Sequence, residues 1–262
     1  MSYTLLNGTY SHSNIFRILD EVTASIKKIK SKLKEEGFNV TKLELAIHGS
    51  SSGAHISLLY SYLVKNQPLP LKFIFDNVGP ISISPYDYWI IPNEKETLLS
   101  IEPDSIEKAK KNKTIIYLNG NGESYMPHFI LLHFMNIFLG RKFNDNFDDM
   151  YNKDKNEINY ESDKFKQLLD KVKYAFPSKY VTKDSPPVLC LYGGNDIGIG
   201  VAQYAKLKQA YIDADIIDKI ELIYFRYGGH GLDDKTLDGR EKMGLISIKK
   251  KEMINKYFHK DD

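Results

Sequence analysis

The segment "LELAIHGSSSGAHISLLYSYL", from Leu43 to Leu63, contains the pattern that decides the fold. An apolar run ends in three serines framed by two glycines, and a helix-like pattern of apolar residues follows. A nucleophilic serine at the end of a sheet strand needs this order of strand, tight turn and helix, because only small residues fit around the turn. A serine-rich loop that caps the helix is the alternative interpretation.

Within this segment, the spacing Gly-x-Ser-x-Gly selects one of the three serines. It is satisfied with Ser51 at the centre, between Gly49 and Gly53. Centring the pattern on Ser50 or Ser52 loses a flanking glycine, so Ser51 is the predicted nucleophile. The helix that follows would direct its first amides and its dipole at any anion that develops beside this serine.

The composition is that of an ordinary soluble globular protein. The 262 residues are 42% hydrophobic and 27% charged, which is enough chain to bury a substantial core. The net charge is +2 and the lysines are spread along amphipathic segments, so we expect no nucleic-acid partner. No signal peptide is visible, and the longest apolar stretch, His128 to Gly140, is too short to span a bilayer. We therefore expect a cytoplasmic protein without a membrane span.

Strand and helix patterns alternate on both sides of an irregular middle section. The first part contains a short strand "SYTLL", a helix from Ser13 or Asn14 to Gly37, then "KLELAI", "AHISLLYSYLV" and "LKFIFDNVG". The last part contains "PPVLCLYGG", "GVAQYAKLKQAYIDA", "KIELIYFRY" and a helix near "KKKEMINKYF". This alternation predicts an α/β fold with a mostly parallel sheet covered by helices on both faces. We expect one domain, residues 1–262, with a lid-like insertion at 81–179.

Two titratable residues follow strands of the last part, each in a glycine-rich loop. Asp196 comes after "VLCLY" and His230 after "IELIYF", which gives the chain order serine, acid, histidine found in hydrolases built on such a sheet. Since ligands of parallel sheets bind at the carboxyl ends of the strands, all three groups would meet there. Asp76, at the end of the strand after the serine turn, is the second candidate for the acid. Asp233 and Asp234 follow the histidine too closely to reach its Nδ1 easily.

The remaining histidines and the single cysteine have structural interpretations. His48 and His55 flank the serine turn and are expected to pack. The other histidines show no metal-ligand spacing, so we predict neither a metal nor a cofactor (His12, His128, His133, His259). Cys190 lies in an apolar run and is expected to be a buried thiol.

Three stretches together resemble one family. "HGSSSGAH", "YVTKDSPPVLCLYGGNDIGIGVAQYAKLKQA" and "YGGHGL" are similar to the serine, acid and histidine segments of the α/β-hydrolase fold. The resemblance is to the esterase/lipase branch related to bacterial carboxylesterases and acetyl esterases. It covers residues 1–80 and 180–262, and the intervening section is where this family carries a variable lid. Tyrosines and Trp89 in that section would line a substrate pocket.

The resemblance implies a role for each candidate residue. Ser51 would attack an ester carbonyl while His230 takes its proton, and Asp196 would hold the imidazole. The backbone N–H of Ser52 would be one donor of the oxyanion hole. The resemblance thus predicts a serine hydrolase that acts on small or medium acyl esters.

One feature of the family is missing. Its members carry an upstream strand ending in His-Gly-Gly that gives the second oxyanion donor, and no such motif precedes Gly49. Losing one donor costs on the order of 10²–10³ in turnover. The chain resembles one shortened by its first strands, with a sheet edge that would invite pairing with another chain. Amides at Asn7–Gly8 are one candidate for a substitute donor. The alternatives are a remnant that binds a ligand or partner without catalysis, and a serine peptidase of the same fold.

Overall fold

The structure is a computed structural model that describes residues 15–82, 114–119, 122–127, 150–152, 157–159, 161–194, 196 and 199–258. The predicted strand "SYTLL", the Asn7–Gly8 amides and Trp89 lie outside the described residues. So does most of the predicted insertion at 81–179.

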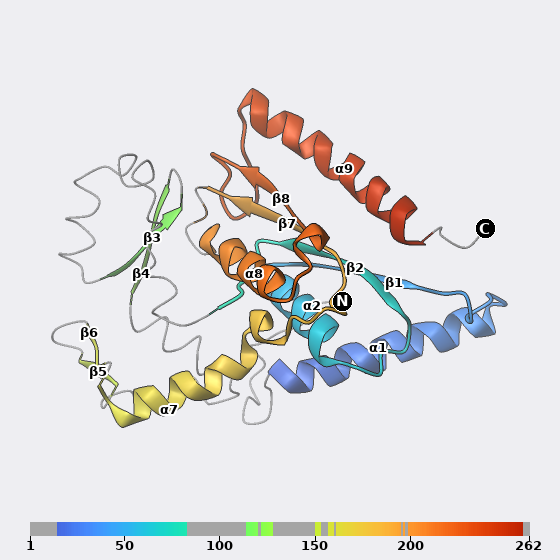
Figure 1. Ribbon diagram of the computed structural model, residues 1–262, viewed down its shortest axis with the longest axis horizontal. Helices are drawn as coiled ribbons and strands as arrows, with labels where there is room; N and C mark the ends of the chain where they lie inside the picture. Colours follow the sequence, from blue (N-terminus) through green and yellow to red (C-terminus); the bar gives the residue numbers. More distant parts are fainter. Residues whose placement is uncertain are drawn as a thin grey trace.

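A parallel sheet forms the centre of the molecule (Figure 1). Its strands, in spatial order, are β1 (Leu45–Ser50), β2 (Leu71–Asn77), β7 (Val188–Gly193) and β8 (Ile220–Phe225). All three neighbouring pairs are parallel. Every residue of β7 is buried, Cys190 included, as expected for a strand that is covered on both faces. The predicted α/β fold with a parallel, doubly covered sheet is confirmed.

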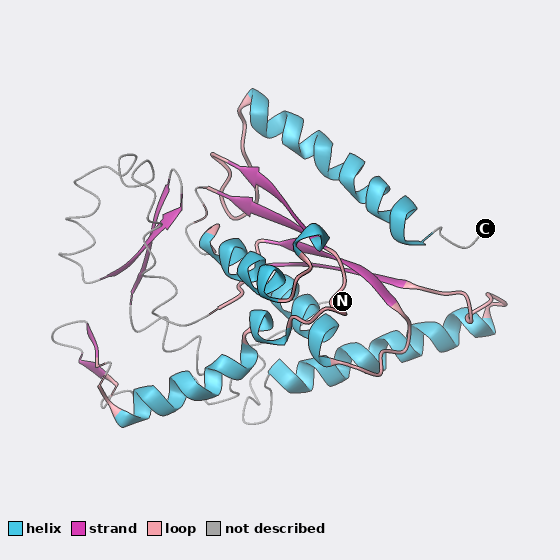
Figure 2. Ribbon diagram, in the orientation of Figure 1, coloured by secondary structure: helices cyan, strands magenta, loops and turns pink. Residues whose placement is uncertain are grey.

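Helices cover both faces of this sheet. They are α1 (Ile15–Glu35), α2 (Ser52–Leu63), α8 (Ala202–Asp213) and α9 (Leu237–Phe258). Figure 2 shows α9 on one side of the sheet, and α1, α2 and α8 on the other. The alternation of β2 explains this division: Phe73 packs against Tyr257 and Phe258 of α9, while its neighbour Ile74 points to the opposite face.

The face of α1 toward the core is the one that its apolar spacing predicts. Its buried side chains recur at helical intervals (Ile15, Ile18, Leu19, Val22, Ile26). Ile29, which continues the same apolar spacing, is 51% exposed, because the core ends before the last turns of the helix. Beyond the helix, Gly37 adopts φ 90°, the left-handed conformation that often follows a helix end.

One helix of the 81–179 region contributes to this core. In α7 (Asp163–Val172), Phe165 and Leu168 are buried in the cluster that includes α1 and α2. This part of the 81–179 region thus packs into the main core, and the insertion and its boundaries stay a prediction.

The other described elements are short. They are the antiparallel pairs β3 (Thr114–Asn119) with β4 (Gly122–Pro127) and β5 (Tyr151–Asn152) with β6 (Glu157–Ile158), and the 3-10 helices η2 (Lys173–Ala175), η3 (Pro177–Tyr180) and η4 (Ile217–Lys219). Among the helices that the structure describes, none has the length and apolar character to cross a membrane.

Candidate active site

The turn between β1 and α2 is strained at the predicted nucleophile. Ser51 has φ 54° and ψ −123°, in a region that residues with a side chain rarely adopt. The Ser51 N–H donates to the Asn77 carbonyl of β2 at 2.8 Å. The Ser51 carbonyl accepts from the amides of Ala54 and His55, at 3.0 and 3.1 Å. The neighbouring strand and the helix thus hold Ser51 in this strained conformation.

The two glycines of the motif have different roles. A Cβ atom at Gly49 would overlap the backbone carbonyl of Gly53 and the amide nitrogen of Ala54. A Cβ at Gly53 would meet nothing within 4 Å. The turn therefore requires glycine at the first position alone, because the backbone of the helix passes directly over the strand end. The expected need for a small residue at both positions is confirmed only for Gly49.

The neighbours of Ser51 differ in what they offer to a substrate. Ser50 is the last residue of β1, and its Oγ accepts a hydrogen bond from Asn77 Nδ2 at 3.2 Å. Ser52 is the first residue of α2. The first amides of a helix have no acceptor within the helix, so the Ser52 N–H is suited to bind an anion beside Ser51.

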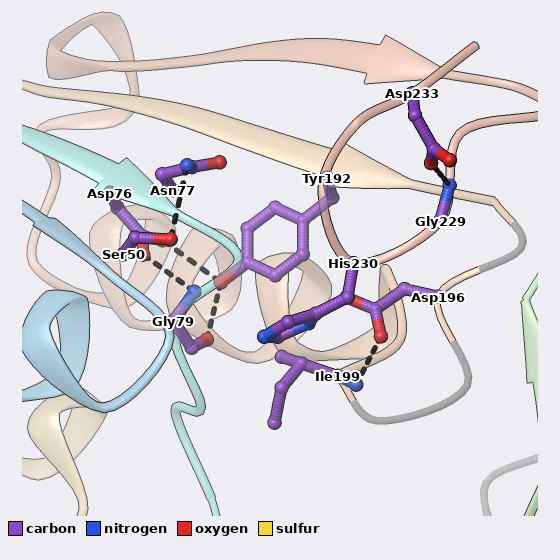
Figure 3. A network of polar contacts seen from close by, with 10 residues as sticks. All are labelled: Ser50, Asp76, Asn77, Gly79, Tyr192, Asp196, Ile199, Gly229, His230 and Asp233. Atoms are coloured by element: carbon purple, nitrogen blue, oxygen red, sulfur yellow. Dashed lines mark hydrogen bonds and ion pairs between the residues drawn. The ribbon is translucent and has the colours of Figure 1, made fainter.

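The predicted acid and base are in contact. His230 Nδ1 lies 2.7 Å from Asp196 Oδ2, and the second carboxylate oxygen accepts from the Ile199 N–H at 2.8 Å (Figure 3). Asp196 is 1% exposed, whereas the His230 side chain is 45% exposed. With its Nδ1 proton donated to the carboxylate, a neutral imidazole presents an unprotonated Nε2 that can accept a proton.

Close backbone packing places the histidine loop on the end of β7. A Cβ at Gly193 would overlap the carbonyls of Gly228 and Gly229, so glycine at the strand end permits this approach. Gly194 N–H donates to the Phe225 carbonyl at 2.7 Å. The loop that carries His230 is thereby fixed against the loop that carries Asp196.

Asp233 and Asp234 stabilise the loop that carries His230 through hydrogen bonds to its backbone. Asp233 accepts from the Gly229 N–H at 3.1 Å, and Asp234 accepts from the Tyr227 N–H at 3.1 Å. A hydrogen bond from the Thr236 side chain contributes most to a lowered pKa of Asp234. Neither carboxylate is the partner of His230, as the sequence predicted.

Asp76, the second candidate for the acid, has other partners. It is fully buried, accepts from the Gly79 N–H, and contacts the Tyr192 hydroxyl. Burial raises its pKa to about 7. The carboxyl that contacts His230 is therefore Asp196.

The two histidines that flank the serine turn, His48 and His55, lie in different environments. His55 is fully buried with Nδ1 2.5 Å from the Pro80 carbonyl oxygen, and burial lowers its pKa to about 4. His48 is exposed, with its ring edge-on to Phe75 at 6.1 Å between centroids. The expected packing role is confirmed for His55, whereas His48 lies at the surface.

The serine and the Asp–His pair lie at the same edge of the sheet. The parallel strands that precede them all end there, and β2 separates β1 from β7. Neighbouring strands are about 4.8 Å apart, so the histidine must reach back across two strand ends to approach Ser51. In Figure 3 the His230 ring extends from Asp196 toward the side where Ser50 and Asp76 lie. The arrangement brings a strained serine, a base and a buried carboxylate to one edge.

No family model matches the sequence, and no curated protein matches it. Among solved structures, the chain is similar to a truncated carbohydrate esterase from gut microbiota, with 17% identity and a TM-score of 0.48, over 88% of this chain and 67% of that one. It is similar to an acetyl ester-xyloside bifunctional hydrolase from Caldicellulosiruptor lactoaceticus, with 16% identity and a TM-score of 0.44, over 90% and 65%. A third is a thermophilic esterase from Thermogutta terrifontis, with 11% identity and a TM-score of 0.48, over 95% and 69%. The chain thus spans about two thirds of the length of each of these three proteins.

Proposed function

We propose that this protein is a serine hydrolase of carboxylic esters. The observation that carries the proposal is the positive φ of Ser51 at a strand-to-helix turn, at the same sheet edge as a buried aspartate in contact with a histidine. A serine side chain in that conformation costs on the order of 1–3 kcal/mol, and such strain clusters at functional sites. Ser51 is the nucleophile, His230 the base and Asp196 its orienting partner.

The reaction follows from these roles. His230 Nε2 takes the Ser51 Oγ proton as Oγ bonds to the carbonyl carbon, and the Ser52 N–H donates to the oxyanion. The imidazolium, stabilised by Asp196, returns its proton to the alcohol oxygen as the ester C–O bond breaks. Water then attacks the acyl-serine, with His230 again as base, and releases the carboxylic acid and the free serine.

The substrate class rests on the family that the motifs resemble. We infer small or medium acyl esters, acted on by a single domain with an insertion at 81–179. A peptidase would use the same three residues. With the Ser52 N–H as its one named oxyanion donor, the site would be slower than a two-donor site by on the order of 10²–10³. A binding protein without turnover is the alternative that this single donor favours.

The test is hydrolysis of p-nitrophenyl acetate and butyrate by the wild type and by Ser51→Ala, with Ser50→Ala as the matched control. We expect a loss on the order of 10⁴-fold or more in the first variant and little change in the second. Equal rates in wild type and Ser51→Ala, with both folded by circular dichroism, would leave only a binding role. Loss in Ser50→Ala alone would move the nucleophile by one residue. A peptide amide series run beside the esters separates a peptidase from an esterase.

A further inference from the structure

A buried polar ring lies beside the candidate site, at the end of β2. Its members are Asp76, Tyr192 and Gly79, and both side chains are 0% exposed. The Tyr192 hydroxyl lies 2.9 Å from Asp76 Oδ2 and 2.6 Å from the Gly79 carbonyl oxygen. The Gly79 N–H donates to Asp76 Oδ1 at 2.9 Å. Figure 3 shows the ring between the ends of β2 and β7. The proposed reaction does not use it.

The number of protons in the ring decides the state of Asp76. The Tyr192 hydroxyl has one proton but two acceptors, the Asp76 carboxyl and the Gly79 carbonyl. If Asp76 is ionised, one acceptor goes without that proton. If Asp76 Oδ2 is protonated, it donates to the Tyr192 oxygen, Tyr192 donates to the Gly79 carbonyl, and Gly79 N–H donates to Oδ1. Only the protonated acid closes the ring, and buried polar groups are nearly always satisfied.

The surroundings of Asp76 favour the same state. The ionisable groups that interact with it come from α2, β7 and α8, and burial raises the pKa of each of them (Tyr62, Cys190, Tyr192, Tyr211). Hydrogen bonds from Tyr192, the Cys190 thiol and the Gly79 N–H lower the pKa of Asp76, but burial outweighs them. These neighbours are neutral phenols and a neutral thiol, so none supplies the positive charge that a buried carboxylate needs. Burial raises the pKa of Asp76 itself to about 7.

The ring holds a segment that touches the serine turn. We call Val78–Ser82 the β2 loop. A Cβ at Gly79 would lie 2.8 Å from the Ala54 Cβ of α2, so the loop packs closely on the first turn of that helix. At its far end, the amides of Ile81 and Ser82 both donate to Gln203 Oε1, at 2.6 and 2.7 Å. The loop is thus fixed between α2, which follows Ser51, and α8, which follows Asp196.

This loop begins with a strained residue of its own. Val78 has φ 49°, an outlier for a β-branched side chain, and such a conformation persists only where the surroundings hold it. The preceding residue, Asn77, pairs in register with Ser50 and accepts the Ser51 N–H. Two strained residues, Ser51 and Val78, therefore follow directly after paired strand ends.

We propose that Asp76 is a proton-holding positioning residue, whose neutral carboxyl closes the ring with Tyr192 and Gly79 and so fixes the β2 loop against the Ser51 turn. Its effect on catalysis rests on the proposed function; its protonation does not. This role differs from that of Asp196, the proposed orienting partner of His230, so the two carboxyls of this sheet edge would act in different ways.

The first arm of the test needs no activity. Infrared spectra of protein labelled with ¹³C-aspartate, taken as differences between wild type and Asp76→Asn near pH 6, are expected to contain a protonated carboxylic acid band from Asp76. Tyr192→Phe, which removes its partner, is expected to shift that band. A carboxylate band from Asp76 under these conditions would overturn the proposal.

The second arm measures the rate at which a fluorophosphonate modifies Ser51. Asparagine preserves the ring, since its Nδ2 donates to Tyr192 and its Oδ1 accepts from Gly79. Asp76→Asn should therefore react within about threefold of wild type, while Asp76→Leu and Tyr192→Phe slow by on the order of tenfold to a hundredfold through misplacement. A loss in Asp76→Asn as large as in Asp76→Leu would mean that the negative charge is needed, and would overturn the proposal. If wild-type Ser51 does not react at all, the hydrolase function falls, and the infrared arm still decides the state of Asp76.

Discussion

Replacement of Asp76 by asparagine should change how the stability of this protein depends on pH. The pKa of the buried carboxyl is raised from 3.8 to about 7. The folded state therefore binds this proton more tightly than the unfolded state does. The stabilisation is fully present below pH 3.8 and is lost as the pH rises through about 7. Asp76→Asn has no group that titrates there, so its free energy of unfolding lacks this decline.

The expected size follows from the separation of the two pKa values. They differ by about 3 pH units, and each unit corresponds to about 1.36 kcal/mol, so the full effect is about 4 kcal/mol. The unfolding free energy of Asp76→Asn minus that of wild type should rise by about this amount between about pH 4 and pH 7, and level off above. Titrations shared by both proteins cancel in the difference.

Urea denaturation at half-unit steps from about pH 4 to about pH 8 measures this difference. The same substitution at the exposed Asp184 controls for loss of a charge without loss of a buried group. A difference that stays constant with pH would refute the raised pKa. A difference that falls as the pH rises would mean that Asp76 is ionised in the folded protein.

Three further predictions test other parts of the structure. Gly49→Ala should lower the free energy of unfolding by on the order of 1–3 kcal/mol, because the added Cβ would overlap the backbone of the turn. Gly53→Ala should be tolerated, because nothing lies within 4 Å of its added Cβ. Urea denaturation of both variants measures the two free energies of unfolding. Asp196→Asn should lower ester hydrolysis by on the order of 10⁴-fold, whereas Asp233→Asn should stay within about tenfold of wild type, as kcat/KM would measure. Leu168→Ala, in α7, should cost about 2–5 kcal/mol in a single unfolding transition, because its side chain is 1% exposed in the shared core.

Each of these has an outcome that contradicts it. Equal stabilities for the two glycine variants would mean that the turn relaxes around the added carbon. Equal losses for the two aspartate variants would mean that loop integrity, and not the Asp196 carboxylate, supports turnover. A separate low-stability transition in Leu168→Ala would mean that α7 unfolds apart from the main core.

Local signals in the sequence were sufficient for the four strands of the parallel sheet and for α1, α2 and α8, but they predicted only the last part of α9 and did not predict α7. The apolar residues of α1 recur at helical spacing, which is readable from the sequence, and apolar runs predicted β2 and β7. The glycine spacing around Ser51 predicted a tight turn because the steric conflict at Gly49 arises within five residues of chain. These features depend on residues that are close in sequence, so they can be predicted from the sequence alone.

Contacts across the sheet depend on which strands become neighbours, and only the tertiary structure decides this. Asp76 lies at the end of one apolar strand and Asp196 follows another, and either fits the chain order of a serine hydrolase. His230 contacts Asp196 because the strands that precede these two residues, β8 and β7, are adjacent. Asp76 is buried against Tyr192 because its strand, β2, lies on the other side of β7. From the sequence "VLCLYGG" alone, Tyr192 would be interpreted as a core residue without a polar role. A hydrogen bond forms only where the fold brings donor and acceptor within about 3 Å, and that distance is set by strand order and not by local sequence.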